Sequence, residues 1–163
     1  DHRDLHLSLR RQRQMCIRDR VDTDAVGHGG NWTSPAYENA VIRVDTYLQQ
    51  IFSFIDSDNR FKNNTSIILV ADHGGTGMRH ADTSNSLNYT IPFYVWGPGV
   101  AKGKDIYSLN KKSRKDPGLA YPSYEDPFQP IRNGDAANLA MSLLGLPAIS
   151  GSTINSNQDL RVQ

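Results

Sequence analysis

The chain has little cysteine, little net charge and no long hydrophobic run. A single cysteine among 163 residues excludes an internal disulfide framework and a metal site of the CxxC type. With 18 basic and 17 acidic side chains the net charge is +1, which argues against intrinsic disorder and against a broad nucleic-acid-binding surface. No apolar run approaches the ~18 residues that a membrane span needs. We therefore expect a folded globular domain of mixed secondary structure.

The first 20 residues differ in composition from the rest of the chain. They hold six arginines and three aspartates, whereas the other 143 residues carry 12 basic and 14 acidic side chains. This stretch lacks the apolar core of a signal peptide. Its second half, residues 11–20 (RQRQMCIRDR), resembles translated sequencing-adapter sequence. We expect residues 1–20 to be a non-native or disordered segment, the alternative being a basic tail that contacts an anionic partner.

Two amphipathic helices are expected in the remaining chain. Ser34 and Pro35 form a good helix start, with serine as the N-cap and proline at the first helical position. Apolar side chains then recur at steps of three and four, which predicts a helix over residues ~35–55. A second helix is predicted from Asp135 to Leu144, where Gly145 ends it.

Two short apolar runs predict strands. Ser66 to Ala71 (SIILVA) is continuous and rich in β-branched residues, as in a strand of a parallel sheet that is buried on both faces. Thr90 to Trp96 (TIPFYVW) is the second run, and Pro92 marks it as an edge strand or an irregular start. Alternating strands and helices imply a layered α/β fold with ligand-binding groups at the carboxyl ends of the strands.

A long surface loop is expected over residues ~101–130, which contain four prolines. This loop carries a basic cluster that either steers phosphate or is simply solvated, formed by Lys111, Lys112, Arg114 and Lys115.

Histidine and aspartate gather in two glycine-rich segments. The first holds Asp24 and His28, and the second holds Asp72 and His73, with His80 seven residues further on. These include every histidine beyond residue 20. We expect both segments to be loops at strand ends, where carboxylate and imidazole together are typical ligands of zinc and also suit manganese or iron. The alternatives are surface histidines and N-capping aspartates without a metal.

From residue 21 onward the chain resembles the alkaline phosphatase superfamily, within it the type I phosphodiesterase/nucleotide pyrophosphatase-like branch. Four ordered elements carry the resemblance: D-x-x-G-H at residues 24–28, a strand followed by ADHGG at 67–75, His80 followed by IPF and GPG at 91–99, and RNGD to LGLP at 132–147. The resemblance implies a three-layer α/β/α sandwich of the alkaline-phosphatase-like type. Residues 21–163 would be the C-terminal portion of that catalytic domain, incomplete at its N-terminus.

The resemblance also implies two divalent metal ions, usually zinc, and phosphoryl transfer through a covalent phospho-enzyme. Asp24, His28 and His80 would hold the first ion, and Asp72 and His73 the second. The family further uses an earlier aspartate and a Thr or Ser nucleophile. We expect both upstream of Val21, so this segment alone would be inactive.

The implied protein is a metal-dependent hydrolase of small-molecule phosphate esters, of phosphodiesterase or phosphatase type, with an extracellular or periplasmic location favoured. The alternatives are a sulfatase-type or phosphomutase-type member of the superfamily and a non-catalytic metal-binding or structural fragment. Trp32, Arg79 and Tyr89 are near the ligand segments in sequence and either touch substrate or have structural roles. Asp82 is either a hydrogen-bonding partner of His80 or a loop aspartate.

Overall fold

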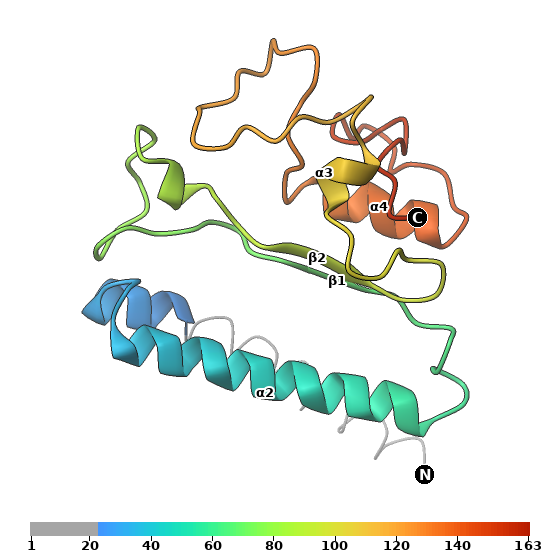
Figure 1. The fold of residues 1–163 in the computed structure, drawn as a ribbon, viewed down its shortest axis with the longest axis horizontal. Helices are drawn as coiled ribbons and strands as arrows, with labels where there is room; N and C mark the ends of the chain where they lie inside the picture. Colours follow the sequence, from blue (N-terminus) through green and yellow to red (C-terminus); the bar gives the residue numbers. More distant parts are fainter. Residues whose placement is uncertain (1–22) are drawn as a thin grey trace. The chain divides into compact units, whose positions relative to one another are not determined.

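The computed structural model describes residues 23–163, so the predictions for residues 1–20 lie outside the described residues. Residues 23–30 are helical and are followed by α2 (Pro35–Ser57), β1 (Ile67–Val70), the 3-10 turn η1 (Ser86–Asn88), β2 (Phe93–Trp96), α3 (Ile106–Leu109) and α4 (Asp135–Leu143) (Figure 1). The chain divides into two compact units. The first runs up to Phe54 and includes Gly75–Asn88, and the second combines Ile55–Gly74 with Tyr89–Gln163. The α/β class expected from the sequence is present.

Helix α2 begins where the sequence predicts. The backbone N–H of Tyr37 donates to Ser34 Oγ at 3.2 Å, which confirms serine as the N-cap. The helix continues to Ser57, two residues beyond the predicted end. Ala40 is the buried residue of α2, whereas Val41 and Ile51 of its apolar stripe are 46% and 44% exposed. The other side chains of the stripe are half-buried, so the stripe identifies the helix although it is only partly covered.

No helix within residues 23–163 combines the length and the apolar character that crossing a membrane requires.

The two strands form an antiparallel pair in the second unit, which corrects the expected parallel sheet. β1 pairs with β2 in the register Ile67↔Trp96 and Val70↔Phe93. The connection over residues 71–92 holds η1 rather than the crossover helix that parallel strands usually need. As expected for an irregular start, β2 begins directly after Pro92.

Burial of the strands is also lower than predicted. β1 is half-buried along its length rather than buried on both faces. In β2, Phe93 and Val95 are half-buried while Tyr94 and Trp96 are exposed, the alternation of a sheet with one covered face. The continuous apolar run therefore predicted the position of the strand correctly. The expected burial on both faces was wrong, because a sequence pattern does not show what packs against each face of a strand.

The core of the second unit lies between the sheet, α4 and the C-terminal segment. Leu139 of α4 is buried together with Leu160 and Val162, and β-strand side chains such as Ile68 and Phe93 pack against them. Helix α4 ends one residue before the predicted boundary, and Gly145 follows it at φ +67°. This left-handed conformation suits glycine at the end of a helix.

The predicted loop over residues ~101–130 contains the short helix α3, which corrects its assignment as loop throughout. Asp105 caps α3 by accepting a hydrogen bond from the Ser108 N–H at 2.8 Å. The local Asp-x-x-Ser pattern therefore supports one helical turn.

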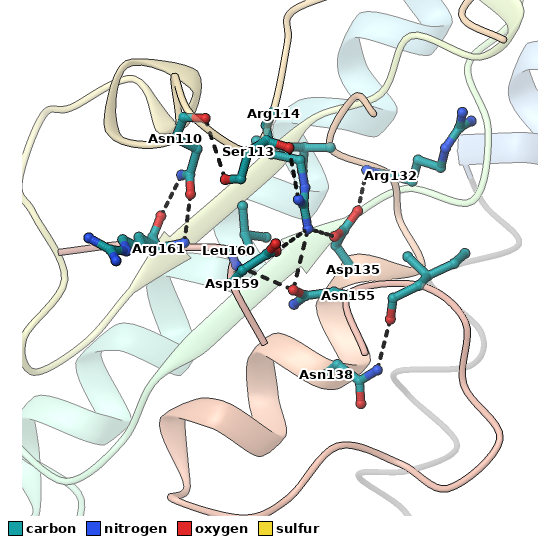
Figure 2. A network of polar contacts seen from close by, with 12 residues as sticks. Asn110, Ser113, Arg114, Arg132, Asp135, Asn138, Asn155, Asp159, Leu160 and Arg161 are labelled. Carbon is teal, nitrogen blue, oxygen red and sulfur yellow. Dashed lines mark hydrogen bonds and ion pairs between the residues drawn. The ribbon is translucent and has the colours of Figure 1, made fainter. Parts of the chain in front are cut away.

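Arg114 from the basic cluster of this loop is enclosed in a polar network (Figure 2). Its Nη2 lies 3.2 Å from Asp135 Oδ1 and 2.8 Å from Asp159 Oδ1, and it donates to Asn155 Oδ1 at 3.4 Å. The Arg114 side chain is 9% exposed. Arg114 therefore joins the start of α4 to the C-terminal segment, which is neither of the two roles considered for the cluster. The three lysines are exposed.

Candidate metal centre

Three of the five predicted ligands come together in the first unit. Asp24 and His28 lie four residues apart in the helical residues 23–30, with His28 Nε2 3.5 Å from Asp24 Oδ1. This corrects the expected glycine-rich loop at a strand end. A helix places positions i and i+4 on one face, so the helical backbone alone brings the carboxylate and the imidazole together. The helical stretch ends at Asn31, which has φ +86°.

His80 completes the group from a separate segment of the same unit. The rings of His28 and His80 are 5.0 Å apart between centroids, and one ligand atom from each of Asp24, His28 and His80 lies within 4.8 Å of the others. A turn precedes His80, in which Thr76 and Arg79 exchange backbone hydrogen bonds of 2.9 and 3.1 Å. Gly77 at φ +60° makes this turn possible. We call these three side chains the Asp24 cluster.

The backbone of this turn orients the His28 ring. His28 Nδ1 lies 2.9 Å from the carbonyl oxygen of Met78. A carbonyl oxygen only accepts, so Nδ1 donates this hydrogen bond, and Nε2 is the ring nitrogen that faces Asp24. Such a contact fixes the tautomer of a metal-binding histidine. No feature of the sequence indicates this contact, because any residue at position 78 supplies the same carbonyl.

Aromatic side chains border the Asp24 cluster. The ring of Trp32 lies 4.9 Å from His28 and 5.9 Å from His80, between centroids. Tyr37 is 6.2 Å from Trp32, and its pKa is raised by burial and by the nearby charge of Asp24. The contacts of Trp32 with the histidine rings favour the structural role considered for it over a role in touching substrate.

Asp72 and His73 lie in the second unit, directly after β1 as the sequence predicts. His73 Nε2 is 3.8 Å from Asp72 Oδ2, and His73 Nδ1 lies 2.8 Å from the Gly74 carbonyl oxygen. His73 therefore presents Nε2 in the same tautomer as His28. Asn133 donates to the Asp72 carbonyl oxygen at 3.0 Å, which ties this strand end to the start of α4. Within residues 23–163, these two are not part of a group of three possible ligands.

The other candidate residues have local structural contacts. Asp82 accepts hydrogen bonds from the Ser84 N–H at 2.9 Å and from the Ser84 hydroxyl at 2.7 Å, and these bonds lower the pKa of its carboxyl. This supports the interpretation of Asp82 as a loop aspartate. Tyr89 stacks edge-on against Tyr121 at 5.5 Å in the second unit. Arg79 is exposed beside His80.

The donor set of the Asp24 cluster fits a divalent metal ion. One carboxylate and two imidazoles are the ligands found in many catalytic zinc sites, and bonds of ~2.0–2.2 Å place ligand atoms roughly 3.4 Å apart. The Asp24–His28 separation of 3.5 Å already matches this spacing. The other separations between the three ligand atoms are at most 4.8 Å.

The profile of the family "Type I phosphodiesterase / nucleotide pyrophosphatase" matches residues 21–129, more than half of the chain, and the chain belongs to this family. The family resemblance seen in the sequence is thus confirmed, and the matched range includes all five predicted ligands. The chain is 29% identical over 104 residues to GPI ethanolamine phosphate transferase 1 of Aspergillus fumigatus. The alignment covers 62% of this chain and 10% of that protein, so the chain spans about a tenth of its relative's length. No solved structure matches the chain.

Proposed function

We propose that this chain supplies a divalent-metal site to an enzyme that cleaves or transfers phosphate esters. The observation that carries the proposal is the Asp24 cluster, whose three ligand atoms lie within 4.8 Å of one another inside the range matched by the phosphodiesterase family. Carboxylate and imidazole are suitable ligands for zinc, the metal we propose.

Each residue of the cluster has a defined task in this proposal. Asp24 contributes negative charge, while His28 and His80 contribute neutral imidazole nitrogens. When bound, the metal supplies Lewis-acid stabilisation of charge on phosphoryl oxygens and lowers the pKa of an attacking hydroxyl. The Met78 carbonyl holds His28 in the tautomer that leaves Nε2 available. The attacking oxygen is not assigned to a residue of the described chain.

We propose Asp72 and His73 as ligands of a second metal ion in the same enzyme. Support comes from their position at the end of β1 and from the contact of His73 Nδ1 with the Gly74 carbonyl oxygen, which leaves Nε2 on the side of Asp72, 3.8 Å from its Oδ2. Family membership supports a three-layer α/β/α sandwich to which residues 21–163 contribute a C-terminal portion. The remaining ligands of such a site would come from other parts of the sandwich.

Transfer of a phosphate ester is a second candidate beside hydrolysis. The relative from Aspergillus fumigatus is an ethanolamine phosphate transferase by its name, and it aligns over 62% of this chain. Hydrolysis and transfer share the metal site and differ in the acceptor, water or another hydroxyl. Both candidates take a small-molecule phosphate ester as substrate.

Zinc titration of the chain and of three variants tests the metal site. The wild type is expected to bind zinc, and His28→Ala is expected to lose the ion at the Asp24 cluster, whereas His73→Ala, at the proposed second site, should keep it. Asp82→Asn is the matched control, because this nearby carboxylate bonds Ser84 instead. Unchanged zinc stoichiometry in His28→Ala contradicts the proposal.

Assays on bis-p-nitrophenyl phosphate and p-nitrophenyl phosphate then separate the functional classes. Hydrolysis that requires zinc and disappears in His28→Ala supports a hydrolase. Zinc binding without hydrolysis agrees with the transferase, with the non-catalytic alternative and with a hydrolase whose attacking oxygen is not supplied by this chain.

A further inference from the structure

The indole of Trp32 lies beside both histidine rings of the Asp24 cluster. It meets His28 edge-on, with an interplanar angle of 80° and centroids 4.9 Å apart, and His80 at 75° and 5.9 Å. His28 and His80 are 52 positions apart in the chain. One aromatic side chain thus contacts the ligands from both segments.

Two glycines make room for this indole. A Cβ atom at Gly27 would lie 2.5 Å from Trp32 Cε2, and a Cβ at Gly75 would overlap Trp32 Cδ2. Gly27 is in the helical residues that carry His28, and Gly75 begins the segment that leads to His80. The indole is therefore seated directly against the backbone of both ligand-bearing segments. Gly29 is different, since a Cβ there would meet nothing within 4 Å.

The backbone around Trp32 is tied to the same turn. The Trp32 N–H donates to the Gly77 carbonyl oxygen at 2.9 Å, and His28 Nδ1 donates to the next carbonyl, that of Met78. The backbone of Trp32 and the ring of His28 thus bond to adjacent carbonyl oxygens of the same turn. The indole then fills the space between these two hydrogen bonds and His80.

We propose that Trp32 is a positioning residue of the metal site: its indole, seated on Gly27 and Gly75, fixes the His28 and His80 rings relative to each other. This inference rests on the proposed metal site and assigns Trp32 no contact with the ion. Packed rings lose less rotamer freedom when a metal binds, because they are already held near the binding geometry. Removing the indole takes this packing contact away from both imidazoles.

Zinc affinity, measured by competition with a chromophoric chelator, tests this role. Trp32→Ala is expected to weaken zinc binding by about 10- to 100-fold, the range seen when a group that orients a metal ligand is lost. Trp32→Phe keeps an aromatic ring and is expected to restore part of the affinity. The visible spectrum of bound Co²⁺ gives a second readout, because its bands depend on ligand geometry, and we expect them to shift in Trp32→Ala.

The two glycines of the helical segment provide a matched pair. Gly27→Ala is expected to weaken zinc binding by about tenfold or more because it displaces the indole, whereas Gly29→Ala leaves affinity unchanged. In the Trp32→Ala background, Gly27→Ala should cause no additional loss, since the atoms it collides with are gone. Additive losses in this double-mutant cycle contradict the inference.

If Trp32→Ala fails to fold, the fluorescence of Trp32 itself provides a second test. In Trp96→Phe, Trp32 is the remaining tryptophan of the chain. Its fluorescence should be quenched by Co²⁺ over the same concentrations that produce the cobalt spectrum, and unchanged emission on cobalt binding overturns the inference.

The outcomes separate this inference from the proposed function. If His28→Ala abolishes zinc binding while Trp32→Ala and Gly27→Ala bind like the wild type, the metal site stands and the role of Trp32 is wrong. If the wild type binds no zinc, both are wrong.

Discussion

Backbone carbonyls orient the rings of two histidines in this protein. His28 Nδ1 meets the Met78 carbonyl oxygen at 2.9 Å, and His73 Nδ1 meets that of Gly74 at 2.8 Å. In both rings Nε2 therefore faces a carboxylate, that of Asp24 in one case and that of Asp72 in the other. A neutral imidazole with a fixed tautomer needs no proton rearrangement before it binds a metal.

At the residue scale we predict that Asp58 titrates at about pH 2. Side-chain and backbone hydrogen bonds from Arg60 lower its pKa to about 2 from the usual 3.8. Because the folded-state pKa is lowered, the stabilising contact is present above pH 3.8 and is lost as the pH falls toward 2. Carboxyl chemical shifts recorded by NMR against pH measure this value. In Arg60→Ala the midpoint should return toward 3.8, and an unchanged midpoint would show that Arg60 is not the cause.

The identities of the candidate ligands were readable from the sequence, but their surroundings were not. Asp24, His28 and His80 were selected by residue type and family resemblance, and the structure brings them together. The contact of Trp32 with the two rings depends on an approach to Gly27 and Gly75 from different segments. Single-chain periodicity carries no information on contacts of that kind.

At the element scale, Ser34 determines where α2 starts. Its Oγ accepts the Tyr37 N–H at 3.2 Å, so Ser34→Ala removes one of the few partners available to the first turn. We predict a loss of about 1 kcal/mol in the free energy of unfolding, measured by urea denaturation. Ser53→Ala, an exposed position within the same helix, is the control and should be neutral. Equal effects of the two substitutions would argue against the cap.

Arg114 stabilises the second unit by pairing with two carboxylates. Asp135 is 2% exposed, so Arg114→Ala leaves a buried charge without its guanidinium (Figure 2). We predict that this substitution destabilises the unit by about 3–5 kcal/mol, the cost typical of breaking a buried pair. Chemical denaturation followed by circular dichroism measures the loss. Lys115→Ala, at the next and exposed position, should change stability by no more than about 0.5 kcal/mol.

Short-range sequence patterns predicted where helices and strands lie better than they predicted how the strands pair. The N-cap of α2, the apolar run of β1 and the glycine after α4 each act within a few residues, and each was located correctly. Sheet direction was wrong, because an apolar run looks the same in parallel and antiparallel pairs. The helical conformation of residues 23–30 was missed because three glycines favour a loop by propensity, while the structure holds them in a helix.

At the scale of the whole molecule, the two compact units divide the predicted ligands between them. Asp24, His28 and His80 belong to the first unit, and Asp72 and His73 to the second. Segments distant in sequence build the first unit, so its ligands converge only in the folded chain. The metal binding that we propose at the Asp24 cluster would therefore be linked to folding.

We predict that zinc raises the thermal stability of the chain. A ligand that binds only the folded state at 100 times its Kd stabilises it by about 2.7 kcal/mol, which corresponds to several degrees in Tm. EDTA should reverse the shift, and His28→Ala should abolish it. Zinc should raise the Tm of Asp82→Asn as much as that of the wild type. An equal rise in the Tm of His28→Ala would show that zinc binds elsewhere.

Anomalous diffraction at the zinc absorption edge, from crystals grown with zinc, tests the metal site most directly. If Asp24, His28 and His80 bind the ion, a peak will lie about 2.0–2.2 Å from Nε2 of His28 and from a carboxylate oxygen of Asp24. Zinc peaks elsewhere with none between these three side chains, or no peak at all, would contradict the assignment of the Asp24 cluster as a metal centre.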